Sequence, residues 1–221
     1  MNIPEAVDKI ISQSPFLEEA LSDGLINVSS LARKIKSEVK TLTHKEVGES
    51  AIIMAINRRP VMRSVRISKG IRAFMNGLGD IIVRSGLSDH TFENSAGLGA
   101  CQRRLMDEAA QEREVFFTFS RGVYETTIVS SGSLDPVIDR IFAGEKRISV
   151  KKGLSSVTLS LPKNNTEVSG VYYFILKSLA WAGINVAEVI STSNEISIVV
   201  ADQDVHRAFA ILMGLKRTGG G

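Results

Sequence analysis

Apolar residues recur every three or four positions through the first part of the chain, which is the pattern of helices that bury one face. The pair Ser14-Pro15 favours a helix start, because proline at the first helical position loses no hydrogen bond, and Gly24 favours a stop. Asn27 or Ser29 can cap the next helix. Its apolar stripe consists of Val28, Leu31, Ala32, Ile35 and Val39. We therefore expect residues 3–57 to be helical.

Residues 43–46, Thr-His-Lys-Glu, have the form of a capping box and predict the start of a fourth helix. Its apolar positions are Val47, Ala51, Ile52, Ala55 and Ile56. This order suits a small bundle of helix-turn-helix type, although the connection is longer than the usual tight turn. Because Pro60 blocks a helical hydrogen bond, we assign residues 1–60 to a helical bundle and 61–78 to a basic linker or wing.

Beyond residue 79 the pattern changes to strands that alternate with helices. The expected elements are a strand, a helix, a hairpin and a helix, over residues 80–93, 95–111, 115–131 and 135–144. Asp135 and Pro136 favour the start of the last of these, with Asp135 as its cap, and Gly144 favours its end. The segment therefore has the order strand, helix, strand, strand, helix.

The remainder of the chain repeats this order. Val157, Leu159 and Leu161 alternate with polar residues, as in a half-buried strand. The elements expected after residue 147 cover 148–162, 166–182, 187–192, 195–200 and 204–215. The two units are about 70 residues long and are read as an internal repeat. We assign residues 79–147 and 148–217 to two domains.

In each domain, a sheet with both helices on one face is the simplest packing, because each strand then needs only one apolar face. The fold class is therefore α+β, with a small helical bundle followed by two ferredoxin-like units of βαββα type. The helix expected over 171–182 is apolar nearly all round. A second covering surface, from the other repeat or another subunit, is expected to bury it.

Composition narrows the function classes. Hydrophobic residues make up 43% of the chain and charged residues 23%, which favours a packed core over disorder. The single cysteine, Cys101, rules out an internal disulfide, and we expect it to be a small buried residue. No run of apolar residues is long enough for a membrane span and the start has no leader pattern, so a cytoplasmic protein is expected.

Catalytic patterns are missing from the sequence. The glycine pairs at 77–79 and 97–99 lack the lysine and spacing of a phosphate-binding loop. The three histidines, His44, His90 and His206, are expected on different elements as exposed residues. Glu188 and Glu195 flank a turn and are expected to face solvent. We therefore expect no enzyme activity, no metal site and no cofactor.

The net charge is only +3, but basic residues gather in one stretch without an acidic neighbour. They are Arg58, Arg59, Arg63, Arg66, Lys69 and Arg72. Such a local field attracts phosphate or acidic protein. A solvated linker explains the stretch as well as nucleic-acid contact does, and the sequence leaves both open.

Near the end, the chain reads LPKNNTEVSGVYYFILKSLAWAGINVAEVISTSNEISIVVADQDVHRAF. This stretch resembles an ACT domain, in particular the regulatory domains of aspartate kinases, and the resemblance covers residues 157–212. The residues that carry it are an Asn-rich loop, a helix, Ala-Gly-Ile-Asn and Ile-Ser-Thr-Ser. One residue more than usual lies between the last two motifs. The first unit resembles the family only in element order and in its loop ENSAGLG.

The resemblance implies an amino-acid ligand, bound where the loop after a first strand meets the second strand of a partner domain in a homodimer or larger homo-oligomer. The residues at this place are Asn164, Asn165, Thr166, Glu167, Ser169, Gly170, Val189, Ile190, Ser191 and Thr192. Independently, amides at a helix start favour a carboxylate. The alternative is that Asn165 or Thr166 caps its own helix, while Gly170 relieves packing.

The expected function is that of an amino-acid-sensing regulator. It would be a transcriptional regulator if the helical bundle binds DNA. The alternative is a regulatory module that acts on a separate biosynthetic enzyme such as an aspartate kinase, with the bundle contacting protein. Binding to DNA through phosphates would weaken steeply with salt, which distinguishes the two.

Overall fold

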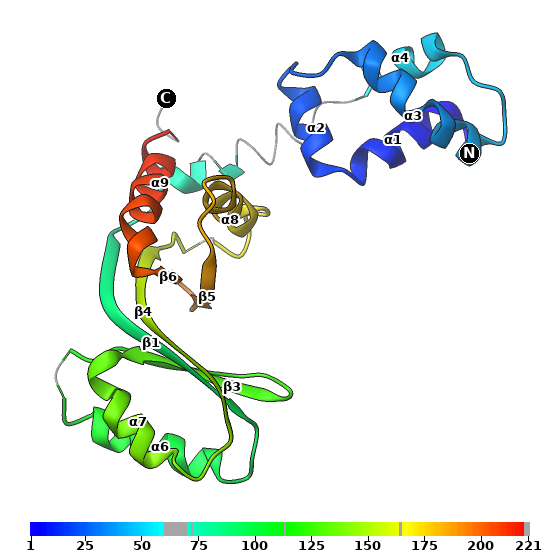
Figure 1. The fold of residues 1–221 in the computed structure, drawn as a ribbon. Coiled ribbons are helices and arrows are strands. Elements are labelled where there is room, and N and C mark those ends of the chain that lie inside the picture. Colours follow the sequence, from blue (N-terminus) through cyan, green and yellow to red (C-terminus); the bar gives the residue numbers. More distant parts are fainter. Residues whose placement is uncertain (60–69, 72, 113, 164, 219–221) are drawn as a thin grey trace. The chain divides into compact units, whose positions relative to one another are not determined.

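The computed structural model describes residues 1–59, 70–71, 73–112, 114–163 and 165–218. The chain divides into two compact units, residues 1–71 and 72–221, whose elements are shown in Figure 1. The division falls inside the segment predicted to be a linker or wing, most of which lies outside the described residues.

Helices make up most of the described part of the first unit. They are α1 (Ile3–Ser12), α2 (Pro15–Ser22), α3 (Val28–Thr43) and α4 (Glu49–Asn57). Buried apolar residues of α1, α3 and α4 form its core together with Val47, which precedes α4; these residues are Ala6, Val7, Ile10, Ile11, Leu31, Ala32, Ile35, Val39, Val47, Ile52, Ala55 and Ile56. The apolar positions that recur at helical spacing in the sequence therefore meet inside this unit.

The start of α3 and the start of α4 differ in how well the sequence predicts them. Asn27 caps α3, since its Oδ1 accepts a hydrogen bond from the amide of Ser30 at 2.9 Å. The capping box expected at residues 43–46 is wrong. Thr43 is the last residue of α3, where its hydroxyl donates to the carbonyl of Val39 at 2.8 Å, and His44 ends the helix in the left-handed region. The α4 helix begins only after Gly48.

The second unit contains an antiparallel sheet of six strands in the order β2-β3-β1-β4-β6-β5. The strands are β1 (Ile81–Glu93), β2 (Phe117–Arg121), β3 (Glu125–Ser131), β4 (Arg147–Ser160), β5 (Val186–Ser191) and β6 (Glu195–Ala201). The helices are α6 (Leu98–Ala109), η1 (Gly132–Leu134), α7 (Asp135–Ile141), α8 (Val171–Trp181), η2 (Asp202–Asp204) and α9 (Val205–Thr218). Residues 73–76 are also helical.

The expectation of two separate sheets is wrong, because β1 and β4 are long and run through both repeats. They are 13 and 14 residues long and pair with each other along most of their length. The β3 strand pairs with β1 only over 87–93, and β6 pairs with β4 only over 154–160. One continuous sheet results, and a boundary at residue 147 or 148 falls at the start of a strand that serves both repeats.

Each repeat nevertheless has the four strands of a ferredoxin-like unit. We call the part with β2, β3, α6, α7, residues 87–93 and residues 147–152 the first half. The part with β5, β6, α8, α9, residues 81–85 and residues 154–160 is the second half. The strand missing from each βαββα pattern is supplied by the extension of a long strand, so each half has the strand order fourth, first, third, second. The second half is therefore discontinuous in sequence.

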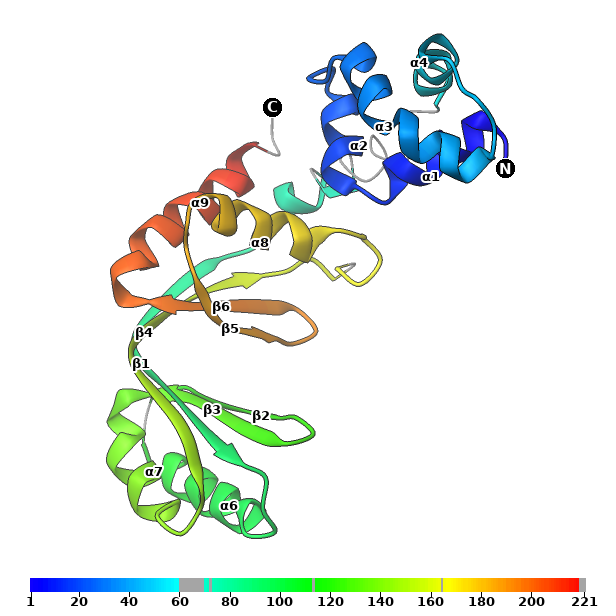
Figure 2. The same cartoon turned by 45° about the vertical axis from the view of Figure 1, so that its right-hand side comes forward.

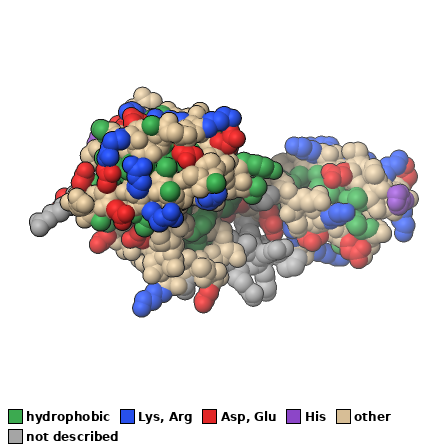
Figure 3. Space-filling model, turned by 90° about the horizontal axis from the view of Figure 1, so that it is seen from below, with side chains coloured by type: hydrophobic (Ala, Val, Ile, Leu, Met, Phe, Trp, Pro, Cys, Tyr) green, Lys and Arg blue, Asp and Glu red, His purple; other side chains and the backbone are tan. Residues whose placement is uncertain are grey.

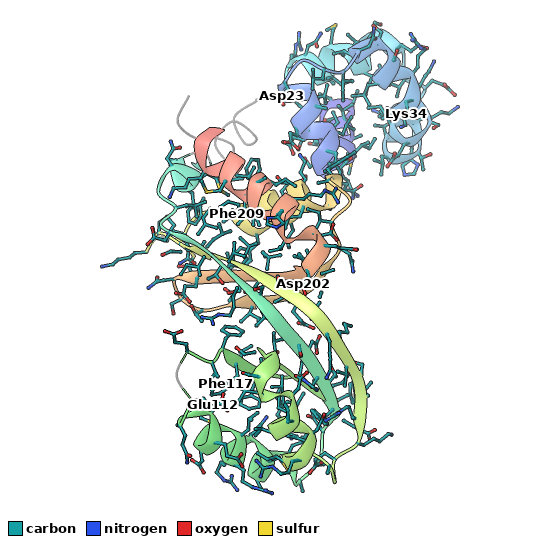
Figure 4. The ribbon with its side chains drawn as sticks, turned by 60° about the vertical axis from the view of Figure 1, so that its left-hand side comes forward. Asp23, Lys34, Glu112, Phe117, Asp202 and Phe209 are labelled. Carbon is teal, nitrogen blue, oxygen red and sulfur yellow. The ribbon has the colours of Figure 1, made fainter. Side chains whose placement is uncertain are left out.

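A short sequence repeat marks the point where the long strands pass between the halves. Gly-Leu-Ser occurs at 86–88 and again at 153–155. Both glycines are in the left-handed region, with φ of 70° at Gly86 and 68° at Gly153, a conformation that glycine adopts without steric cost. Each serine then bonds to an aspartate near the second helix of its half, Ser88 to Asp135 at 3.2 Å and Ser155 to Asp202 at 2.5 Å. Asp202 is labelled in Figure 4.

The two halves share a small apolar cluster on the sheet face away from their helices. Leu87, Val129, Leu154 and Val199 are its buried members. Neighbouring residues on the same strands point the other way, as with Ile128, which packs against α6 and α7. Figures 1 and 2 show the result, with α6 and α7 outside one end of the sheet and α8 and α9 outside the other. The β2–β3 and β5–β6 hairpins lie between them.

Two local features of the second half bear on the sequence predictions. A register shift between Val186 and Glu188 in β5 lies at the place where one extra residue was noted. The α8 helix begins at Val171 and not at Thr166, so that prediction is wrong by five residues. Gly170, with φ of 90°, is in a conformation that cannot continue a helix, and residues 165–169 form turns before it.

Candidate functional site

The loop between β4 and α8 lies against the β5–β6 turn. The side-chain amide of Asn165 donates to the carbonyls of Pro162, at 3.2 Å, and of Ser193, at 2.5 Å. Beside this contact, the hydroxyl of Tyr172 lies 2.7 Å from Oγ of Ser191. The structure therefore places Asn165 beside the β5–β6 turn and Ser191 beside the first turn of α8.

The N-cap residue of α8 is a glycine. Gly170 has no side chain of its own with which to cap the first turn. Free amides at a helix start carry partial positive charge and are satisfied by water, side chains or an anion. The alternative that Asn165 or Thr166 caps this helix is wrong, because α8 starts beyond both and the Asn165 amide is bound to backbone carbonyls. Gly170 itself adds no Cβ at this helix start.

The other predicted ligand-binding residues are distributed unevenly. Thr166, Glu167 and Ser169 are exposed in the loop, and Thr192 closes the β5–β6 turn through its amide, which donates to the carbonyl of Glu195 at 2.9 Å. Val189 shares the strand face of Ser191, whereas Ile190 points to the opposite face and packs against the apolar cluster between the halves. Ile190 therefore does not join the others. Asn164 lies outside the described residues.

The corresponding place in the first half is filled by the chain itself. Oγ of Ser95 accepts hydrogen bonds from the amides of Gly97 and Leu98, at 3.1 and 3.2 Å, at the start of α6. The same hydroxyl donates to Oε2 of Glu145 at 2.5 Å. A Cβ at Gly97 would collide with Oε1 of Glu145, so glycine here leaves room for that carboxylate. A hydroxyl and a carboxylate of this chain thus occupy the start of α6.

Sequence reasoning missed a buried polar network in the first half. His90, expected to be exposed, is completely buried, and its Nε2 lies 2.9 Å from Oδ1 of Asp135. Oδ2 of Asp135 accepts from Ser88 and pairs with Lys152 at 2.8 Å. Burial alone would raise the pKa of Asp135, but the hydrogen bonds from Lys152, His90 and Ser88 outweigh it and hold that pKa below its usual value.

This network does not have the order of a serine–histidine–carboxylate triad. The Ser88 hydroxyl bonds to Asp135 and not to His90, so the imidazole does not lie between the hydroxyl and the carboxylate. Asp135 was predicted to cap α7, yet it is the first residue of that helix and the N-cap residue is Leu134. The Asp135 carboxylate turns to the sheet because Ser88, His90 and Lys152 offer donors there. The recurring Gly-Leu-Ser motif is the sequence signal that points to Asp135 and Asp202.

A pair of carboxyl groups, Glu188 and Asp89, lies between the halves. Burial raises the pKa of Glu188 in β5, and the nearby charge of Asp89 in β1 raises it further, while Lys151 lowers it. Asp89 is buried, with Lys151 at 3.7 Å from its Oδ2. Glu188 is only partly exposed, so the expectation that it simply faces solvent is wrong.

The basic stretch is described only at its start. Arg59 turns into the first unit, where it bonds to Asp8 at 2.8 Å, to Ser12 at 3.1 Å and to Glu18 at 3.5 Å, and its side chain is only 16% exposed. Its guanidinium therefore links α1 and α2 within the first unit. Arg58 is exposed. Arg63, Arg66, Lys69 and Arg72 lie outside the described residues, and DNA binding by this segment stays a prediction.

Basic and acidic side chains are interspersed over the face of residues 72–221 drawn in Figure 3. Among the described residues, no helix is long and apolar enough to cross a membrane. Within the same residues, no cluster of three or more His, Cys, Asp or Glu side chains is arranged to hold a metal ion. Cys101 is partly buried and its thiol donates to the carbonyl of Ile141 at 3.4 Å.

Comparison with known proteins finds similarity in fold. The chain matches no protein-family model and no curated protein sequence. Among solved structures, the regulatory subunit of aspartate kinase from Thermus thermophilus matches with a TM-score of 0.50 and 10% identity, over 62% of this chain and 97% of that subunit. The α and β subunits of an aspartokinase match with a TM-score of 0.50 and 14% identity, over 63% and 98%.

A whole aspartate kinase, the allosteric enzyme of Clostridium acetobutylicum, also matches, with a TM-score of 0.52 and 14% identity over 62% of this chain. The match spans only 34% of that enzyme, so the likeness concerns one part of it. The structures matched over nearly their full length include a regulatory subunit. The matched part of the chain thus shares its α+β fold, with an antiparallel sheet, with a regulatory subunit of an aspartate kinase.

Proposed function

We propose that this protein is an amino-acid-responsive regulator, and that the second half binds one free amino acid at the start of α8. The observation that carries the proposal is a helix start with glycine as its N-cap residue, placed beside the β5–β6 hairpin by the Asn165–Ser193 and Tyr172–Ser191 contacts. The ligand carboxylate would accept from the first-turn amides. The exposed carboxylate of Glu167 and the hydroxyls of Ser169 and Ser191 are available to its amino group.

The regulatory role follows from the place of this site at a sheet edge. The β5 strand is the last strand of the sheet, so a second copy can approach the ligand there. A ligand shifts an equilibrium between two arrangements only if it binds one of them more tightly. A ligand shared by two copies would meet that condition, because separation removes half of its contacts. The dimer through β5 that belongs to this proposal is held by the shared ligand, so it forms only with the amino acid bound.

Isothermal titration calorimetry of the purified chain against each of the common amino acids tests the proposal. We expect one amino acid, or a small set of related ones, to bind with one site per chain. Asn165→Ala should weaken binding roughly tenfold, because the loop loses its tie to the hairpin. Ser95→Ala, at the corresponding helix start of the first half, is the matched control and should bind normally. No heat with any amino acid at millimolar concentration would contradict the proposal.

A further inference from the structure

One stretch of sheet edge stays unpaired within the part of the chain that the structure describes. On the side away from β4, none of the residues that the structure describes pairs with the first part of β1, since β3 joins β1 only from Leu87 onward. Ile82 and Val83, on opposite faces of this edge, are 56% and 45% exposed. An exposed apolar edge strand is a template for pairing with another strand.

The backbone groups that face this edge follow from the pairing with β4. The amide of Ser160 donates to the carbonyl of Asp80 at 3.0 Å, so Asp80 directs its carbonyl toward β4. Residues of an antiparallel strand alternate in the side to which their amides and carbonyls point. Ile82 and Arg84 therefore also bond toward β4, whereas Ile81 and Val83 direct their groups to the open edge.

In one antiparallel register, the outward backbone groups of this edge form hydrogen bonds with the same edge of a second copy. We propose that residues 80–84 of two chains pair antiparallel around a twofold axis at Ile82. Ile81 then faces Val83 of the second copy, so the outward groups of both residues form hydrogen bonds. Asp80 faces Arg84 of the second copy at a closely spaced position, and the symmetry repeats this contact. The strand thus carries opposite charges at the two positions that face each other in the dimer.

Arg84 can make this contact without losing the one it has. Its NH1 donates to the carbonyl of Glu114 at 3.1 Å, and the guanidinium lies 5.7 Å from the Phe116 ring centroid. A guanidinium carries five N–H donors, so others remain for a carboxylate. The left-handed Gly86 bends the strand after Ser85, which limits the added pairing to this short stretch.

The corresponding open edge of the first half does not suit a second copy. It is the start of β4, which carries Arg147, Lys151 and Lys152. These cations pair with Asp139, Asp89 and Asp135 within the chain, so two such edges would bring like charges together without new partners. The proposed interface lies at the opposite end of the second half from β5, and it does not depend on the proposed amino-acid site.

Charge reversal in two separate chains tests the register. Asp80→Arg places like charges opposite each other twice in the dimer, and so does Arg84→Asp. Without added amino acid, each variant alone should raise the dissociation constant of the dimer by roughly tenfold or more in sedimentation velocity. An equimolar mixture should form a heterodimer with near wild-type affinity, because each chain then meets the opposite charge. A role of either residue within one chain cannot produce this rescue.

Val83→Pro provides a second variant that keeps the fold. Its amide points to the open edge, so proline removes a bond to the second copy but none to β4. Dimerisation should be lost, while Ile148→Lys, on the other open edge, leaves it unchanged. The inference is overturned if the wild type is monomeric up to high micromolar concentration, if Val83→Pro dimerises normally, or if the mixture of reversed chains fails to associate. Calorimetry with amino acids on Asp80→Arg reports on the ligand site separately.

Discussion

The two halves of the sheet share strand order and connections, yet they differ at the place where a first strand passes into its helix. In the first half a loop of four residues leads to α6, and Ser95 with Glu145 occupies the helix start. In the second half the loop has ten residues, and α8 starts at Val171 with Gly170 as its N-cap residue. The comparison teaches that one fold can place its own serine and carboxylate at one helix start and a longer loop that ends in glycine at the equivalent one.

A second difference lies in the cores. The position two residues after Ser88 is His90 in the first half, and the position two residues after Ser155 is Val157 in the second. Asp135 therefore has a buried imidazole and Lys152 as additional partners, whereas Asp202 has Ser155. The first half depends on a polar network where the second half has a plain apolar core.

The largest expected effect is on the free energy of unfolding, and it distinguishes the two cores. Asp135→Ala leaves the buried His90 without its partner and should lower the free energy of unfolding by roughly 3 kcal/mol. Asp202→Ala removes one hydrogen bond near the surface and should cost about 1 kcal/mol. Urea unfolding followed by circular dichroism measures both. Equal losses would show that the His90 network is not what distinguishes the halves.

The same network gives a pH dependence. The pKa of Asp135 is lowered in the folded state, so its carboxylate stabilises the fold above the ordinary aspartate pKa of about 3.9. That contribution is lost as the pH falls through the lowered pKa. The stability difference between wild type and Asp135→Asn should therefore be full at pH 7 and shrink in strongly acidic solution.

The two left-handed glycines should behave alike, which tests the internal repeat. Gly86→Ala and Gly153→Ala each force a side chain into a positive φ, at a cost of roughly 1–2 kcal/mol. A Cβ at either position has room, so backbone strain is the cause. Gly144→Ala, at an open position with ordinary φ, is the control and should be neutral. Thermal unfolding compares the three, and a harmless Gly86→Ala would remove this glycine from the repeat.

Removal of the cap at α6 should have a smaller effect on stability, and the response to an anion should differ between variant and wild type. Ser95→Ala frees the Gly97 and Leu98 amides and should cost about 1 kcal/mol of stability. Adding acetate should recover part of this loss in the variant, because an anion can replace the lost acceptor. The wild type, with Ser95 and Glu145 in place, should gain less from acetate at this helix. An equal gain in both proteins would count against the closed state of the α6 start.

The smallest expected effect concerns Glu188, between the halves. Its raised pKa means that the charged form disfavours folding, so stability is lost as the pH rises through that pKa. Glu188→Gln removes the charge and should stabilise the protein at pH 7 by less than about 1 kcal/mol. The gain should vanish below about pH 4, where glutamate is protonated in both states. A gain that is independent of pH would point to packing instead.

Much of the fold is predictable because alternation and helical spacing survive in the sequence. Val157 and Leu159 are buried on one side of β4, and the helix stripe with Leu31 and Ile35 is buried in the first unit. The joining of both repeats in one sheet is not visible, because a long strand with a left-handed glycine reads like two segments. The Gly-Leu-Ser repeat is the only local sign of it.

The candidate site shows the same limits. The placing of Asn165 beside the β5–β6 turn agrees with what the resemblance implies, although ligand binding there stays a prediction. The start of α8 could not be placed from sequence, because Asn165 and Thr166 are good capping residues and only the backbone conformation of Gly170 decides against them. The burial of His90 depends on Asp135, which is distant in sequence, so local patterns give no sign of it.

The most direct test of the central claim is an amide NMR titration of the isotope-labelled chain with each amino acid. We predict that one amino acid shifts the amide resonances of Val171 and Tyr172, at the open helix start, and leaves those of Gly97 and Leu98 unchanged. Shifts at Gly97 and Leu98 without any at Val171, or no shift with any amino acid, would contradict it.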